Sequence, residues 1–156
     1  MNVKLKLKQL GLKLPTAPKP IGNYEAAVRA GDLLFISGQL PLENGELRYV
    51  GRVGSEVTEQ QGYAAAQLAA LNVLAQIESA LGGFDRLAHL VRLEGHVASA
   101  PEWHDAPKVL DGASDLFLRV LGEKGQHTRS AFCPARLPKN AAVELVVIAA
   151  VNPSET

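Results

Sequence analysis

The alternation of hydrophobic and polar positions predicts short strands in the first third of the chain. Residues 26–29 and 33–37 flank a tight turn, which is typical of two paired strands. The segment 33–36 is continuously apolar, and such a run favours a strand buried on both faces. Residues 41–55 are rich in glycine and predict a loop with a short strand near 47–50.

Two long helices are predicted in the middle of the chain. Apolar residues recur every three or four positions over Glu59–Leu81. Thr58 and Gln61 have the spacing of a capping box at the start of this helix, and Gly82 is placed to end it. A second helix is predicted over 105–121.

Three more strands are predicted over 87–99, 129–132 and 143–151. The predicted order is β-β-α-β-α-β, where the last β stands for the two closing strands, 129–132 and 143–151. Two helices can cover only one face of such a sheet, so we expect an α+β layer. Both faces of the strand 143–151 are apolar, however. Something else must cover the second face, and another copy of the chain is the most economical candidate.

Composition and charge narrow the class of protein. The chain has 156 residues, of which 47% are hydrophobic, and this predicts one folded domain. Sixteen basic residues balance sixteen acidic ones, so no nucleic-acid partner is expected and copies do not repel one another. Cys133 is the single cysteine, which excludes an intrachain disulfide and favours a cytoplasmic location. No unbroken apolar run approaches about 18 residues, so no membrane span is expected.

The first 19 residues differ from the rest, because they contain five lysines and no acidic residue. Their apolar spacing predicts a short amphipathic helix ending near Gly11, followed by an extended, proline-rich connector. This basic arm (1–19) is either a packing appendage with a solvated lysine face or an arm for nucleic acid. Residues 20–156 are interpreted as one domain.

Several chemistries have no motif in this chain. It contains no phosphate-binding loop, no dinucleotide fingerprint, no serine-hydrolase elbow and no zinc-site spacing. We therefore expect no metal and no cofactor. His96 and His127 are expected to be structural or surface residues.

Two charged residues in apolar strands remain as candidates for chemistry. Glu144 lies in the most hydrophobic strand, where a carboxylate must be paired, solvated by a pocket or protonated. Arg129 opens the preceding strand, and its planar fork suits bidentate capture of a carboxylate. Either the two pair with each other across adjacent strands, or they form a ligand site. Cys133 is expected to be a buried, inert thiol.

The two ends of the chain resemble the Rid (YjgF-type) family, which includes the enamine/imine deaminases. The resemblance is carried at one end by Pro20-Ile21-Gly22-Asn23-Tyr24, Ala27-Val28-Arg29-Ala30-Gly31 and Leu33-Leu34-Phe35-Ile36-Ser37-Gly38-Gln39, and at the other by Arg129-Ser130, Leu137-Pro138 and Val143-Glu144-Leu145. It implies an α+β chorismate-mutase-like fold in which two helices cover one face of a mixed sheet and three copies form a barrel.

The same resemblance implies a function and its residues. The family's homotrimer has sites between subunits, where Tyr24 and Ser37 would line the pocket and Arg129 would clamp a substrate carboxylate. Glu144 would orient or activate the attacking water. The implied reaction is hydrolysis of a small 2-imino or enamine carboxylic acid to a 2-keto acid and ammonia, without a cofactor.

The chain departs from the family pattern at two positions. Ala131 stands where family deaminases often have a cysteine, and Asp111 aligns with an asparagine and could repel an anionic substrate. These departures favour an alternative function, a non-catalytic protein that binds a small carboxylate. An endoribonuclease or translation inhibitor is a third alternative, against which the zero net charge argues.

Overall fold

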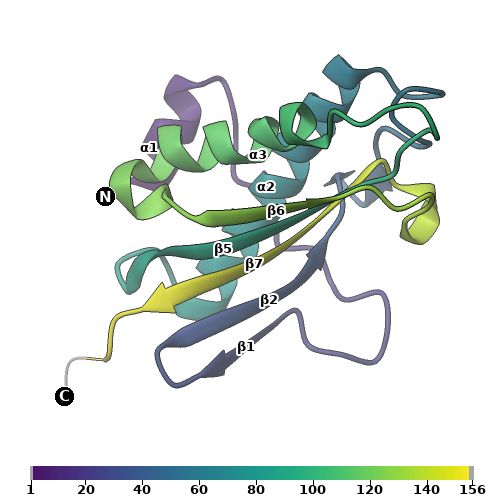
Figure 1. Ribbon diagram of the computed structural model, residues 1–156. Helices are drawn as coiled ribbons and strands as arrows, with labels where there is room; N and C mark the ends of the chain where they lie inside the picture. Colours follow the sequence, from purple (N-terminus) through teal and green to yellow (C-terminus); the bar gives the residue numbers. More distant parts are fainter. Residues whose placement is uncertain (1, 155–156) are drawn as a thin grey trace.

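The computed structural model describes residues 2–154 and contains a five-stranded mixed sheet (Figure 1). The strand order is β1-β2-β7-β5-β6; β5 and β6 are parallel, and the other neighbours are antiparallel. The strands span Ala27–Ala30 (β1), Leu33–Gln39 (β2), Leu87–Val97 (β5), Thr128–Phe132 (β6) and Val143–Val151 (β7). The loop predicted over 41–55 instead contains a small hairpin, β3 (Leu42–Glu43) and β4 (Glu46–Leu47).

Two long helices, α2 (Glu59–Leu81) and α3 (Ala106–Leu121), lie on the same side of this sheet and pack against each other (Figure 1). The predicted α+β layer is therefore confirmed. Two short 3₁₀ helices span Gly122–Gly125 and Pro138–Asn140. The closing pair of strands is not a hairpin, since β7 lies between β2 and β5 while β6 lies at the sheet edge.

The predicted start and end signals of α2 are confirmed. The Thr58 side chain accepts from the backbone N–H of Gln61, and the Gln61 side chain accepts from the N–H of Thr58. Gly82 ends the helix in the left-handed conformation, at φ 71°. By length and composition α2 could cross a membrane, which the search for an unbroken apolar run missed. Most of it is buried in the core of this fold, as is usual for the central helix of a soluble protein.

The sheet has one covered face and one open face. Along β7, Val143, Leu145 and Val147 are buried under the helices, and the residues between them are only half-buried. Across the strands the register defines an open face, formed by Val28, Phe35, Arg92, Glu94, His96, Ser130, Phe132, Glu144, Val146 and Ile148.

The apolar run 33–36 is not buried on both faces, so that prediction is wrong for the single chain. Leu34 and Ile36 are buried, whereas Leu33 and Phe35 are 37% and 42% exposed. The side chains alternate because the strand is pleated, and the helices cover only one of its faces. Its two outward residues, Leu33 and Phe35, belong to the open face, so the run is apolar although the helices bury only Leu34 and Ile36.

The predicted N-terminal helix is present as α1 (Val3–Gln9). Val3 and Leu7 are buried in the main core, and Lys4 forms an ion pair with Glu78 of α2 at 2.8 Å. The remaining lysines of α1 are exposed, as expected for an amphipathic helix with a solvated face.

Candidate functional site

Glu144 is the second residue of β7, and its side chain lies on the open face. On one side it is paired in register with His96 of the neighbouring strand β5. On its other side β2 bulges between Ile36 and Gln39, so that Gly38 lies against the Glu144 carboxylate. A Cβ at position 38 would be 2.8 Å from Cδ and Oε2 of Glu144, so a glycine is needed here for the carboxylate to keep its place.

Burial raises the pKa of the Glu144 carboxyl above its ordinary value, and the charge of His96 opposes this only in part. Among residues 2–154, no lysine or arginine forms an ion pair with Glu144. Its charge is thus only partly solvated and has no lysine or arginine partner among the described residues. A carboxyl group whose pKa is raised by burial is suited to act as a general base that takes up and releases a proton.

Glu144 lines a small, partly open hollow. Tyr24 and Ser37 line the same hollow, so the structure places three of the predicted residues together. The Ser37 hydroxyl donates to the carbonyl of Glu25 at 2.6 Å, and the Tyr24 hydroxyl accepts from the N–H of Ile21 at 3.3 Å. Each hydroxyl is thereby held in a defined direction at the wall of the hollow.

Two buried glutamines support this wall, and the sequence patterns did not reveal them. Gln76 of α2 donates to the carbonyl of Pro18 at 2.7 Å and to the side-chain oxygen of Gln39 at 3.2 Å. Gln39 in turn donates to the carbonyl of Ser37 at 3.0 Å. The amides thus connect the long helix to the β2 bulge and to the proline-rich connector.

Replacing Gly38 with alanine is expected to displace the Glu144 carboxylate and leave the fold intact, because the clash is with the end of a flexible side chain. We expect a loss of Glu144-dependent activity and a lower melting temperature. In a Glu144→Ala background the clash is absent, so Gly38→Ala should cost less stability there than in the wild type. An equal cost in both backgrounds would show that Gly38 serves the backbone and not the carboxylate.

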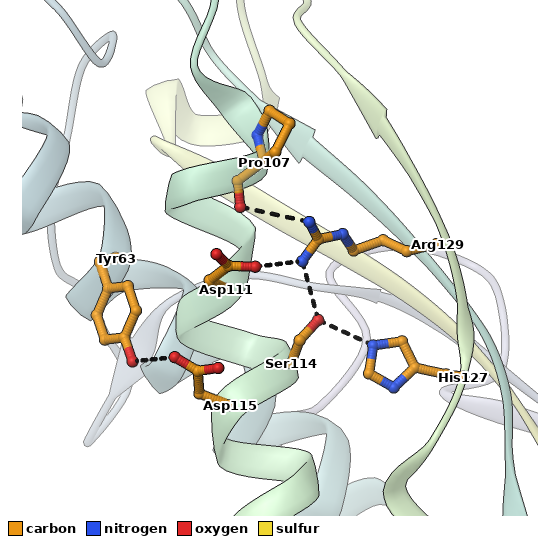
Figure 2. A network of polar contacts seen from close by, with 7 residues as sticks. All are labelled: Tyr63, Pro107, Asp111, Ser114, Asp115, His127 and Arg129. Carbon is orange, nitrogen blue, oxygen red and sulfur yellow. Dashed lines mark hydrogen bonds and ion pairs between the residues drawn. The ribbon is translucent and has the colours of Figure 1, made fainter.

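Arg129 lies on the other side of the sheet. It is paired in register with the buried Leu93, so its side chain points to the helix face. There its Nη1 donates to Oδ1 of Asp111 at 2.8 Å and to Oγ of Ser114 at 3.1 Å, both on α3 (Figure 2). Nη2 donates weakly to the carbonyl of Pro107, at 3.5 Å. The arginine side chain is 25% exposed and that of Asp111 51%.

His127 holds Ser114 in this network (Figure 2). Its Nδ1 lies 2.6 Å from the carbonyl of Gly125, which makes Nδ1 the donor and leaves Nε2 as an acceptor. Nε2 lies 2.9 Å from the Ser114 hydroxyl, which therefore donates to it. The prediction that His127 is a structural residue agrees with these contacts. No local sequence signal marked Ser114, because its role depends on the approach of β6 to α3.

Arg129 and Glu144 do not pair with each other, which corrects one of the two alternatives drawn from the sequence. Their strands are separated by β5, and their side chains lie on opposite faces of the sheet. The ionic partner of Arg129 is Asp111. The candidate residues of one chain therefore form two separate halves on opposite faces of the sheet. One half is the Glu144 hollow (Tyr24, Ser37, Gly38, Glu144), and the other is the Arg129 cluster (Arg129, Asp111, Ser114, His127).

The expectation for Cys133 is wrong, since the thiol is exposed. The strand β6 ends at Phe132, before the cysteine, because Pro134 follows. Within residues 2–154, His, Cys, Asp and Glu side chains form no group of three that could hold a metal ion.

Comparison with known proteins identifies relatives along almost the whole chain. The family model described as "YjgF/chorismate mutase-like, putative endoribonuclease" matches residues 4–151. Protein TCP17 of Trypanosoma cruzi is 41% identical over 152 residues, which are 97% of this chain and 95% of that protein. The 2-iminobutanoate/2-iminopropanoate deaminase of Dermatophagoides farinae is 26% identical, over 90% of this chain and 95% of that protein.

Solved structures give the same result. The protein Atu1372 of Agrobacterium tumefaciens, whose function is unknown, is 41% identical and superimposes with a TM-score of 0.91, over 96% of this chain and 92% of that one. The Escherichia coli protein TdcF, with bound serine, is 26% identical with a TM-score of 0.63, over 86% and 92% of the two chains. The chain thus belongs to the YjgF/RidA family, in a branch nearer to Atu1372 and TCP17 than to TdcF and the mite deaminase.

Proposed function

We propose that this protein hydrolyses small, reactive 2-imino or enamine carboxylic acids to 2-keto acids and ammonia. The observation that carries the proposal is the state of Glu144: a carboxyl of raised pKa, without a lysine or arginine partner among the described residues, at the wall of a hollow. The name of the mite relative and the serine bound to TdcF support a substrate with the skeleton of a small amino acid.

The proton transfers of this reaction need only the Glu144 carboxylate and a water molecule. Glu144 takes a proton from a water molecule while the water oxygen forms a bond to the imine carbon, and the electron pair of the C=N double bond moves to nitrogen. The resulting carbinolamine receives the proton on its nitrogen. The proton of the new hydroxyl is then transferred through Glu144 to the nitrogen while the C–N bond breaks, so that ammonia leaves and the oxygen remains as the keto group. Positioning and a directed water are sufficient because the iminium carbon is already electrophilic.

The Arg129 cluster supplies the carboxylate clamp, and the two halves meet between copies of the chain. Within one chain Arg129 and Glu144 lie on opposite faces of the sheet, so one substrate cannot reach both in the same subunit. A partner copy that packs on the open face would cover the exposed Val28, Phe35 and Phe132 and could bring its own arginine to the hollow. We propose the homotrimer that the family resemblance implies.

The experiment is a panel of amino acids oxidised in situ to imines by an amino-acid oxidase. We expect the purified protein to speed the loss of several imines above the spontaneous rate and to release ammonia and keto acid in equal amounts. The Gly38→Ala protein is the control, because it is expected to retain the fold and to displace the Glu144 carboxylate. No acceleration for any imine would contradict the proposal.

The Asp111–Arg129 ion pair favours a second candidate, a protein that binds a small carboxylate without turnover. The Asp111 carboxylate lies 2.8 Å from the guanidinium and offsets part of its charge, so an anionic substrate would be held less firmly. In this case amino or keto acids should bind to the wild-type protein in calorimetry, while imine loss stays at the spontaneous rate.

A further inference from the structure

Asp111 contacts only one nitrogen of the Arg129 guanidinium, Nη1. Both contacts of the Arg129 guanidinium with α3 side chains use Nη1, and the contact with Pro107 uses one hydrogen of Nη2. Nε has no hydrogen-bond partner among residues 2–154. The Nε–H and the second Nη2–H point in the same direction and form the fork that binds a carboxylate. The ion pair therefore still permits a ligand carboxylate to bind.

Asp111 also has an unused oxygen. Its Oδ1 accepts from Arg129, and its Oδ2 has no partner within the described chain, although half of the side chain is exposed. A ligand carboxylate at the arginine fork would therefore share the guanidinium with a second negative group. A simple anion is attracted by one group and repelled by the other, whereas a ligand that also has a positive charge is attracted by both.

The pair is held in place, so it is a built feature of the site. Ser114 accepts from Arg129 and donates to His127 (Figure 2). The ring of His127 is fixed by the carbonyl of Gly125. The guanidinium cannot turn away from Asp111 without breaking these hydrogen bonds. The positive charge of Arg129 and the negative charge of Asp111 are thus held side by side.

The positive charge that matches Asp111 is not the reacting nitrogen. In the proposed reaction the C=N group must face Glu144, which belongs to the other half of the site, on the open face. Asp111 lies beside the arginine that holds the carboxylate. It is therefore left to contact another part of the substrate, its side chain.

We infer that Asp111 is a specificity residue and that the substrate is an imino acid with a basic side chain, such as a guanidino or amino group. This inference rests on the proposed function. Arginine and citrulline provide a matched pair of probes, because they have nearly the same shape and differ by one positive charge. We expect the imine formed from L-arginine to be hydrolysed at least about tenfold more efficiently than the imine formed from L-citrulline.

The Asp111→Asn variant tests the role of the carboxylate. Asparagine can still accept from Nη1, so the fold and Arg129 should be retained, which circular dichroism and the melting temperature check. We expect the arginine-to-citrulline ratio of kcat/KM to fall about tenfold, towards one. Asp115→Asn is the control, since Asp115 lies one turn along α3 and bonds to Tyr63 at 2.7 Å. It loses the same charge and should leave the ratio unchanged.

The outcomes separate this inference from the proposed function. If both imines are hydrolysed equally well, or if the ratio is unchanged in Asp111→Asn, the inference is overturned while the proposed function stands. If neither of these imines is hydrolysed while others of the panel are, the inference is also overturned. If no imine of the panel is hydrolysed, the proposed function fails, and calorimetry with L-arginine and L-citrulline decides the inference. Tighter binding of arginine that is lost in Asp111→Asn supports it, and equal binding or no binding overturns it.

Discussion

Replacing Arg129 with lysine is expected to reduce the affinity for a carboxylate ligand by roughly tenfold to a hundredfold. Lysine keeps the positive charge but loses the fork, and a hydrogen bond to a charged group contributes about 1–3 kcal/mol. An ammonium group also cannot contact Asp111 and Ser114 and at the same time offer two parallel donors to a ligand. The measurement is calorimetry with a small keto acid, together with kcat/KM for imine hydrolysis.

Arg136→Lys is the control for this prediction, because Arg136 is an exposed arginine on the loop after β6. An unchanged affinity in Arg129→Lys would give Arg129 a purely structural role.

The composite site is tested by refolding Arg129→Lys together with Glu144→Gln. If each site combines residues of two copies, some mixed sites contain both native residues, and activity should return. Light scattering should give three times the 16.6 kDa chain mass.

Replacing Glu144 with glutamine is expected to lower turnover by about a hundredfold or more, which is the usual contribution of a positioned general base. Glutamine has nearly the same shape and cannot accept the proton of the attacking water. The affinity for a keto acid should change little, since the carboxylate clamp belongs to Arg129. A variant with normal kcat would exclude Glu144 from proton transfer.

The same variant should be more stable than the wild type at pH 8. Burial raises the pKa of Glu144 in the folded state, so over the window above its ordinary value of 4.5 the folded state binds more protons than the unfolded state. The wild type therefore loses stability as the pH rises through this window, and glutamine does not. The difference in melting temperature should shrink as the pH falls to 4.5. Glu102→Gln, at an exposed position, controls for the loss of one carboxylate.

The sequence alone determined most of the elements. The capping residues Thr58 and Gln61 and the glycine at position 82 fix the ends of α2, because these signals act through contacts within a few residues. The alternation in β7 showed that both faces are apolar, and the structure shows that the helices cover only one of them. The family was also recognisable, since its motifs are short and contiguous.

The tertiary structure alone decided which functional residues meet. Arg129 and Glu144 are 15 positions apart on successive strands, which suggested neighbours, but β5 lies between those strands. Asp111 and Ser114 come from a helix 15 to 18 positions before Arg129 and are its actual partners. Strand order, register and the approach of a helix to a sheet edge depend on packing between distant segments. A local pattern therefore predicts the element in which a charged residue lies but not the partner it contacts.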